Sequence, residues 1–576
     1  MKRLLRYLKG VWLIVILCPL VMVIEVLCDL MQPKILAGVI DVGVANHDIA
    51  YVYDKGLLLI LLALAGMVSG LVCVILATLA STHFSYNLRL DLFKKIQSFD
   101  FKSINKIGTS SLIVRMTNDV VALQDILMQA LRMMVRAPLL FIGGIIMAVT
   151  INYRLALVLL FSVPVLVLVI RSTIMRGFPF FKQVQNKLDG LNNIIRENLL
   201  GIRVVKNYVK EDKETARFAD EADSLANINI HANQIMALIG PVMNLVMNIT
   251  IVAVLWFGGY LFKSHLIMSG SIISFITYIT QILSALTMLS MILINISRVK
   301  VSVNRVIEVL DTDPSIEGPS LQSFNLPKVE SGEIKFENVS FTYNAGTNED
   351  VLTDINLNIK SGETVAILGG TGAGKSTLIN LIPRLYDPVK GIVKVGGHDI
   401  KEYSIKHLRE NISMVMQSII LFTDTIRENL LKGDENATEE DLFKACETAC
   451  AEEFINQLPE GLDTLLERGG RNLSGGQRQR LCIARALVKK SKIIIFDDAL
   501  SAVDTTTDAK IRAGIKKNYK DITCIIITQR ILSAKNADRI FVLDNGKLAA
   551  EGSHDELLKN SSIYKEIYSS QLEMEL

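Results

Sequence analysis

The chain has 576 residues, of which 50% are hydrophobic and only 6% aromatic, and its formal net charge is +3. This length predicts several domains. The near-neutral charge, with no basic stripe interleaved with aromatic residues, argues against a nucleic-acid partner. The seven cysteines form no C-x-x-C pair, which argues against a zinc site or a disulfide framework and predicts a reducing compartment for the second half.

Apolar residues are concentrated in the first three hundred positions, where runs of roughly 20 residues predict membrane helices. Six runs of this kind occupy residues 11–30, 57–79, 137–151, 155–170, 235–262 and 272–296. Lys2, Arg3, Arg6 and Lys9 precede the first run and predict a cytoplasmic N-terminus. We therefore expect an all-α, six-helix transmembrane domain over residues 1–310.

Two connections on the predicted cytoplasmic side, residues 81–136 and 171–233, are long, rich in Lys and Arg, and helical in pattern. They exceed what is needed to join neighbouring helices of a bundle. We expect them to continue the membrane helices into the cytoplasm. Each then ends in a short segment, residues 99–106 and 201–206, that is able to contact another domain.

Two acidic residues, Glu25 and Asp29, share one helix face within the first membrane run. They either line a cavity that attracts cationic substrates or pair with a basic or amide side chain, for which Arg136, Asn244 and Asn248 are candidates. We favour the pairing, because acids at membrane depth commonly find a partner there.

Residues 311–327 lose periodicity and gather Pro, Gly and Ser, so we interpret residues 311–332 as a linker. An α/β domain follows over residues 333–576. Its clearest motif is GGTGAGKST, a G-x-x-x-x-G-K-S loop between a predicted strand and a predicted helix. Backbone amides of such a loop cradle phosphate oxygens, while Lys375 reaches the β and γ phosphates and Ser376 binds Mg²⁺. The predicted ATP contacts are Gly369, Gly370, Thr371, Gly372, Ala373, Gly374, Lys375, Ser376 and Thr377.

A second motif, IIIFDD, is an apolar run that ends in Asp497 and Asp498. It predicts a strand buried on both faces with its acids at the carboxyl end, where open α/β sheets bind ligands. Taken alone, the stretch fits equally well with one acid that only caps the following turn. Beside a nucleoside triphosphate site, Asp497 becomes the candidate for holding Mg²⁺. The next position, Asp498, would face the attacking water.

A third motif, LSGGQ, places Ser474, Gly475 and Gly476 directly before an amphipathic helix. The beginning of such a helix is a second site for anions. Two phosphate cradles in one domain are useful if each domain offers its second cradle to a nucleotide held by a partner.

With these motifs in this order, the chain resembles the ABC transporters, and in particular exporters whose half-transporter has six membrane helices followed by one nucleotide-binding domain. GGTGAGKST is similar to the Walker A motif, LSGGQ to the signature, IIIFDD to Walker B and SAVD to the D-loop. The resemblance covers essentially the whole chain. It implies that Tyr343 stacks on adenine and that Gln417 of the Q-loop lies near Mg²⁺. It also implies that Ser474, Gly475, Gly476 and Gln477 contact the partner's ATP.

Two positions depart from the family pattern, because Asp498 stands where the family has Glu and Gln529 where it has the switch histidine. The shorter acid retracts the carboxylate by roughly 1.5 Å, and a misplacement of about 1 Å can lower a rate on the order of 10²-fold. Gln529 cannot carry a proton as imidazolium does. The chain therefore resembles the subunit with the degenerate site in a heterodimeric bacterial multidrug exporter.

The resemblance implies the cofactors ATP and Mg²⁺, a second ABC half-transporter as partner, and a bacterial plasma membrane with the nucleotide-binding domain in the cytoplasm. Asp498, Gln529 and Gln417 are the candidate catalytic residues, and Ser376, Gln417 and Asp497 the candidate metal ligands. The expected cargo is a small amphipathic or cationic drug. Two alternatives stay open: export of lipid or peptide, and a membrane regulator that senses ATP without pumping.

Overall fold

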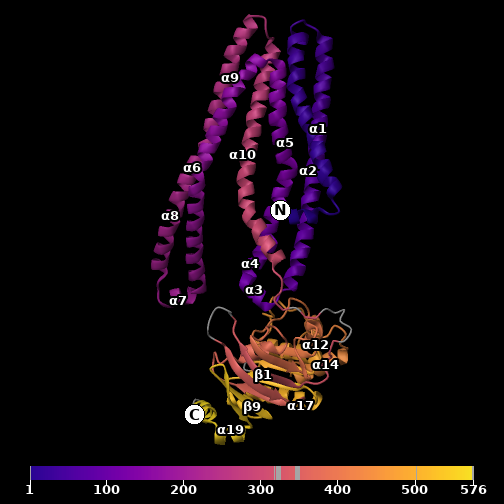
Figure 1. Ribbon diagram of the computed structural model, residues 1–576, viewed down its shortest axis with the longest axis vertical. Coiled ribbons are helices and arrows are strands. Elements are labelled where there is room, and N and C mark those ends of the chain that lie inside the picture. The colour runs from indigo at the N-terminus through magenta and orange to yellow at the C-terminus, as the bar shows by residue number, and fades with distance from the viewer. Residues whose placement is uncertain (1, 317, 320–325, 344–349, 501–502, 574–576) are drawn as a thin grey trace. The chain divides into compact units, whose positions relative to one another are not determined.

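A computed structural model describes residues 2–316, 318–319, 326–343, 350–500 and 503–573 (Figure 1). The chain divides into two compact units. One comprises Met1–Gln97 and Thr109–Thr312, and the other comprises Ser98–Gly108 and Asp313–Leu576. They are called the membrane unit and the soluble unit below.

The membrane unit is helical throughout, and six of its described stretches are long and apolar enough to cross a membrane. This confirms the six predicted spans. The helices are η1 (Lys2–Leu8), α1 (Trp12–Gly38), η2 (Val39–Val44), α2 (Ile49–Gln97), α4 (Thr109–Val114), η3 (Arg115–Asp119), α5 (Val120–Ile151), α6 (Tyr153–Leu200), α7 (Ile202–Asn207), α8 (Glu211–Ala237), α9 (Ile239–Lys263) and α10 (Ser269–Asp311).

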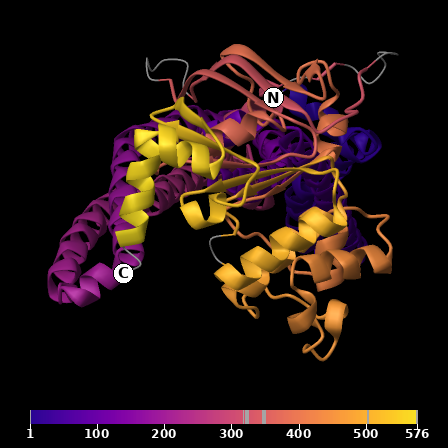
Figure 2. The same ribbon diagram turned by 90° about the horizontal axis from the view of Figure 1, so that it is seen from below.

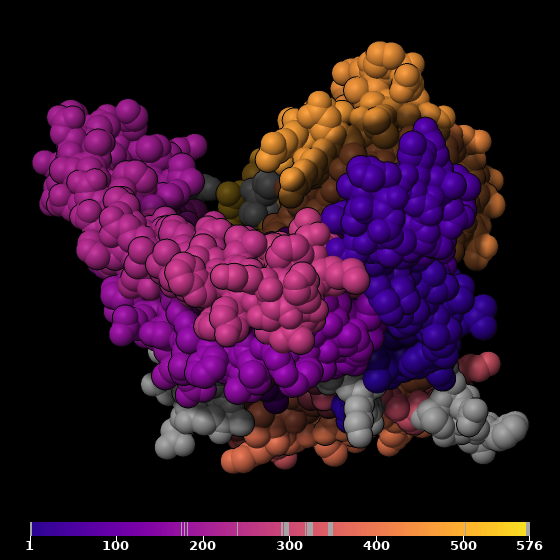
Figure 3. All heavy atoms as spheres, turned by 90° about the horizontal axis from the view of Figure 1, so that it is seen from above, coloured from indigo at the N-terminus to yellow at the C-terminus, as the bar shows by residue number. Residues whose placement is uncertain are grey.

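Within this unit, α1 packs along α2 and α5 packs along α10, whereas α6 and α8 pair with each other. The core includes small side chains such as Cys18, Ala77 and Ala148, which are fully buried and let the helices approach closely. The pair formed by α6 and α8, closed by α7, makes an arm that projects from the other helices of the unit (Figures 1, 2 and 3). The unbroken length of α2 and α6 confirms that membrane helices continue into the long connections.

The two acids of α1 are paired with one arginine of α5. Arg136 Nη1 lies 2.7 Å from Glu25 Oε1, and Arg136 Nη2 lies 2.9 Å from Asp29 Oδ2. On α10, Gln281 donates to the backbone carbonyl of Asp29 at 3.3 Å. The predicted pairing is therefore confirmed, with Arg136 as the partner. Two carboxylates that would be costly at membrane depth share a cation that joins α1 to α5.

The soluble unit contains a four-stranded antiparallel sheet, in the order β2-β1-β4-β5, and a six-stranded sheet, in the order β10-β9-β3-β8-β7-β6. In the larger sheet β9, β3, β8, β7 and β6 pair in parallel, and β10 is antiparallel at the edge. The strands are β1 (Ile334–Phe341), β2 (Leu352–Ile359), β3 (Thr364–Leu368), β4 (Lys390–Val395), β5 (His398–Asp399), β6 (Ile412–Val415), β7 (Ile493–Asp497), β8 (Thr523–Thr528), β9 (Arg539–Asp544) and β10 (Lys547–Gly552).

Every residue of β7 and β8 is buried, which confirms that IIIFD is a strand covered on both faces. Figure 2 shows the two sheets, with α14 to α17 grouped apart from the C-terminal α19 and α20. The helices of this unit are α3 (Phe101–Ile107), α11 (Lys375–Leu381), α12 (Ile405–Glu410), α13 (Ile426–Leu431), α14 (Glu439–Thr448), α15 (Glu452–Ile455), η4 (Gly461–Asp463), α16 (Gly475–Val488), α17 (Thr505–Asn518), α18 (Ile531–Ala534), α19 (His554–Asn560) and α20 (Ser562–Glu573).

The short helix α3 belongs to the soluble unit although it lies between two membrane helices in the chain. Asp100 caps it by accepting from the Ser103 N–H at 2.7 Å, and its other carboxylate oxygen accepts from the Ser315 N–H at 2.7 Å. Asn105 donates to the hydroxyl of Tyr386 at 3.2 Å. The contact predicted for segment 99–106 is thus confirmed. Segment 201–206 largely coincides with α7 of the membrane unit.

Candidate functional site

A cavity of about 300 Å³ in the soluble unit collects residues from most of the motifs singled out in the sequence. It lies at the carboxyl ends of β3, β7 and β8, which are parallel neighbours and therefore end at the same edge of the sheet. Its lining consists of Val351, Thr371, Gly372, Gly374, Lys375, Ser376, Thr377, Gln417, Asp497, Asp498, Ile527, Thr528 and Gln529.

The glycine loop between β3 and α11 needs its glycines for two different reasons. Gly374 has φ +94°, and a Cβ there would meet Leu352 Cδ2 at 2.8 Å. Gly369 lies so close to the backbone carbonyl of Leu543 that a Cβ would collide with it. The loop can therefore approach a ligand with its backbone N–H groups exposed, as phosphate recognition requires.

Lys375, the first residue of α11, is buried, and its Nζ donates to the carbonyls of Gly369 at 2.9 Å and Gly370 at 2.7 Å. Burial lowers the pKa of this ammonium group, while the charges of Asp498 and Asp497 act in the opposite direction. The side chain is therefore held against its own loop as a cation in a partly dry site, where a charge acts strongly on an anionic ligand.

The two acids end the buried strand β7. Asp497 is buried and accepts a hydrogen bond from Ser376 Oγ at 2.9 Å. Burial raises its pKa, and the neighbouring charge of Asp498 adds to this effect. Asp498 has a left-handed backbone with φ +48°, and its N–H donates to the carbonyl of Ile527 on β8 at 3.1 Å. The backbone of Asp498 is thus held in a conformation that L-residues rarely adopt.

The donor set fits a nucleoside triphosphate with Mg²⁺. The hydroxyl of Ser376, the carboxylate of Asp497 and the side-chain amide of Gln417 offer the oxygen ligands that Mg²⁺ prefers. Loop N–H groups and Lys375 suit the phosphates, and the bound ion would neutralise charge on them during phosphoryl transfer. Asp498 and Gln529 line the same cavity, where they can orient a water molecule and accept its hydrogen bond.

The signature residues lie elsewhere. Ser474 caps α16 by accepting from the N–H of Gln477 at 3.3 Å, and the Ser474 N–H donates to Gln477 Oε1 at 2.8 Å. This capping box explains the spacing of Ser and Gln in the motif. Ser474 and Gly475 are exposed, and neither they nor Gly476 and Gln477 line the cavity of the glycine loop. Within the described residues, the signature segment and the glycine loop of one chain do not line a common cavity.

Tyr343 lies beside the glycine loop but lines a different cavity, of about 490 Å³, together with Tyr386 and Lys102 of α3. Its hydroxyl is 3.1 Å from Thr377 Oγ1, and its ring meets that of Tyr386 edge to face at 5.2 Å. Of the D-loop, Ser501 and Ala502 lie outside the described residues, and Asp504 caps α17 by accepting from Thr507 N–H at 2.9 Å.

Sequence reasoning missed Val351, Ile527 and Thr528 in the cavity wall. Thr528 could have been found, because it ends the apolar run CIII directly before Gln529. No local sequence pattern indicates Val351. It lies beside the glycine loop because it directly precedes β2 of the antiparallel sheet.

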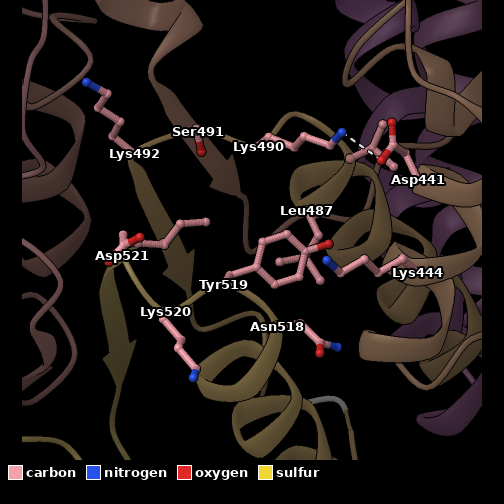
Figure 4. Close-up of a pocket in the computed structure, with 12 residues that line it drawn as sticks. Asp441, Lys444, Leu487, Lys490, Ser491, Lys492, Asn518, Tyr519, Lys520 and Asp521 are labelled. Atoms are coloured by element: carbon pink, nitrogen blue, oxygen red, sulfur yellow. Dashed lines mark ion pairs between the residues drawn. The ribbon is translucent and has the colours of Figure 1, made fainter.

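Another cavity of the soluble unit, of about 360 Å³, has a basic lining (Figure 4). Lys490 is paired with Asp441 at 2.6 Å, Lys444 lies 5.6 Å from the centre of the Tyr519 ring, and Lys492 donates to two backbone carbonyls. Burial raises the pKa of Tyr519 to about 12. These contacts join α14 to the end of α17 and to the segment before β7, and the segment before β7 to the segment before β1; we assign them a structural role.

The comparisons with known proteins agree with this geometry. Residues 15–286 match the model of the ABC transporter transmembrane region, and residues 352–501 match the ABC transporter model. The chain is 37% identical over 571 residues to the ABC transporter ATP-binding protein YfiB of Bacillus subtilis (strain 168), covering 99% of this chain and 98% of that protein.

It is also similar to the ATP-dependent lipid A-core flippase of Desulfotalea psychrophila (strain LSv54 / DSM 12343), with 33% identity over 491 residues and 84% of each chain covered. Among solved structures, a bacterial Atm1-family ABC exporter with ATP bound superposes with a TM-score of 0.79 and 25% identity, over 99% of this chain and 98% of that one. This chain therefore belongs to the ABC transporters: it is an exporter half-transporter, a multi-pass membrane protein whose ATP-binding domain is cytoplasmic.

Proposed function

We propose that this chain is the hydrolytically impaired subunit of a heterodimeric efflux pump in a bacterial plasma membrane. The observation that carries the proposal is Asp498, which lines the cavity beside Lys375 where a water-polarising glutamate would be expected. ATP binds at the glycine loop, and the cavity keeps the groups needed for that binding. The carboxylate that would orient water is too short.

The hydrogen bonding at the end of β7 supports the proposal that the Asp498 carboxylate lies farther from the phosphates than that of a glutamate would. The N–H of Asp498 donates to the Ile527 carbonyl, so the Cα cannot readily move toward the phosphates to compensate for the shorter side chain. One C–C bond is about 1.5 Å, and a displacement of this size can lower a rate on the order of 10²-fold. Gln529 adds to the loss, because an amide does not take up a proton.

The signature supports a partner with a competent site. Ser474 and Gly475 are exposed, and the capping box orders the beginning of α16. The LSGGQ segment is therefore accessible and ordered, and it can bind a nucleotide held by another half-transporter. That partner is expected to carry Glu after its Walker B aspartate. ATP closes the two nucleotide domains, and hydrolysis at the partner's site resets them.

We propose small amphipathic drugs as cargo. Arg136 offsets one of the two negative charges of Glu25 and Asp29, which weakens their attraction for a cationic drug but leaves one net negative charge. Lipid is the second candidate cargo, favoured by the similarity to the lipid A-core flippase. Uptake of a fluorescent drug and flipping of a labelled lipid, both in proteoliposomes, separate the two.

The decisive experiment compares the purified chain alone with the chain co-purified with its half-transporter partner. The proposal predicts slow ATP hydrolysis by the chain alone and cargo-stimulated hydrolysis by the pair. A pair that binds ATP but neither hydrolyses it nor moves cargo would instead indicate an ATP-sensing regulator. Brisk hydrolysis by the chain alone that disappears in Asp498→Asn would refute the impaired site.

A further inference from the structure

The last helix of the soluble unit reaches the loop that follows β8. Gln571 on α20 donates through Nε2 to the backbone carbonyl of Gln529 at 2.7 Å. Its Oε1 accepts from the N–H of Ile531 at 2.8 Å. One side-chain amide therefore satisfies a backbone acceptor and a backbone donor on either side of Arg530.

The backbone that carries Gln571 is itself anchored. Tyr564 on α20 is fully buried and packs with Ile531 and Leu557 in a core under α18 and α19. Its hydroxyl lies 2.7 Å from His554 Nδ1. This packing includes Ile567 and Tyr568 and so anchors α20 up to the turn that carries Gln571; the two hydrogen bonds of Gln571 join the loop to that anchored helix.

The loop is also held from the strand side. Thr528, the last residue of β8, accepts through Oγ1 from the N–H of Arg530 at 3.0 Å. Gln529 thus sits between a buried strand and the contact with α20. Its side chain is exposed and lines the cavity that also contains Lys375, Ser376 and Asp498, at the end where the glycine loop would place the terminal phosphates.

We infer that Gln571 is a positioning residue, which holds the backbone of Gln529 so that its amide faces the γ-phosphate; the inference rests on the proposed role of this site. Through this contact the C-terminal helix controls how well the site distinguishes ATP from ADP. A triphosphate reaches the Gln529 amide and a diphosphate does not, so the control acts on ATP affinity alone.

The test measures binding rather than turnover. The full chain in nanodiscs is titrated with Mg²⁺ and a non-hydrolysable ATP analogue, and separately with Mg²⁺ and ADP. Gln571→Met keeps the length of the side chain and removes both hydrogen bonds. We expect it to lower the ratio of analogue affinity to ADP affinity by about five- to tenfold, as the loss of one or two net hydrogen bonds allows. Gln571→Glu keeps the acceptor for Ile531 but turns a carboxylate oxygen toward the Gln529 carbonyl, and it should lower the ratio at least as much as Gln571→Met.

Gln529→Ala should lower the same affinity ratio. The double variant Gln529→Ala/Gln571→Met should lower it no further than Gln529→Ala does, because both changes remove the same interaction, that of the Gln529 amide with the γ-phosphate. Ser570→Ala, at the neighbouring exposed position of α20, is the control and should leave the ratio unchanged. Hydrogen exchange should rise at the Ile531 amide in Gln571→Met while the amides within β8 stay protected.

Three results would overturn the inference: equal losses for the analogue and ADP in Gln571→Met, additive losses in the double variant, or an unchanged ratio in Gln529→Ala. The failure of the proposed function is seen separately. Fast hydrolysis at this chain's own site would refute the impaired subunit, but it would not alter an affinity ratio measured with a non-hydrolysable analogue.

Discussion

Lengthening the acid at position 498 should restore hydrolysis at this site. The backbone there is held by the hydrogen bond from the Asp498 N–H to the Ile527 carbonyl at 3.1 Å, so Asp498→Glu moves the carboxylate about 1.5 Å farther into the cavity. A correction of this size corresponds to a rise on the order of 10²-fold in kcat, or about 2.7 kcal/mol in the barrier. Adding Gln529→His should raise the rate further.

The assay uses the reconstituted pair with the partner's own catalytic glutamate replaced by Gln, so that any hydrolysis comes from the site of this chain. Release of phosphate is measured at saturating ATP. Asp498→Gln has the length of Glu but no carboxylate, and it should stay as slow as the natural chain. If Asp498→Glu leaves the rate unchanged although ATP still binds, the length of this side chain does not limit hydrolysis and the reasoning from β7 is wrong.

Three further predictions concern stability and ligand binding. Arg136→Leu leaves Glu25 and Asp29 without their cation at membrane depth and should lower the stability of the protein by about 3 kcal/mol, measured as a lower temperature of thermal inactivation. Replacing both acids by their amides in the same variant should recover most of this loss. The affinity for Mg²⁺ in the presence of ATP should fall as the pH is lowered toward and below the raised pKa of Asp497, because burial raises this pKa above the ordinary carboxyl value of 3.8 and the protonated acid cannot bind the ion; in Asp497→Asn only the pH dependence that comes from protonation of the ATP phosphates should remain. Gly374→Ala should lower thermal stability without nucleotide by about 1–2 kcal/mol, since φ is +94° there, whereas Gly370→Ala, with open space around its added methyl, should unfold at nearly the natural temperature.

The sequence sufficed for the features that depend on local pattern. The membrane spans follow from the length of apolar runs, and β7 follows from an unbroken apolar run that ends in acids. The glycine loop carries its own signal, because the spacing of its glycines before Lys375 and Ser376 reflects a single local conformation. The same holds for Ser474 and Gln477, because their capping box involves only the four consecutive residues 474–477.

What the sequence could not supply depends on contacts between distant segments. It left three candidate partners for Glu25 and Asp29, and only the packing of α1 against α5 selects Arg136. Gln571 and Gln529 are in contact although they lie 42 residues apart in the chain. Gln571 belongs to no recognisable motif. A side chain that bonds to the backbone of a distant residue is found only when the fold is known. Every residue has backbone atoms, so the identity of the partner gives no sequence signal.

The position of α3 determines what counts as an independently folding piece of this protein. Asp100 and Asn105 bond to Ser315 and Tyr386, so a fragment that starts after the membrane helices would lack a helix that belongs to its own packing. Such a fragment would present the ring of Tyr386 to water on the face that α3 covers. Supplying residues 98–108 as a separate peptide should therefore protect an ATPase fragment from aggregation, and a peptide with Asn105→Ala and Asp100→Ala should protect it less.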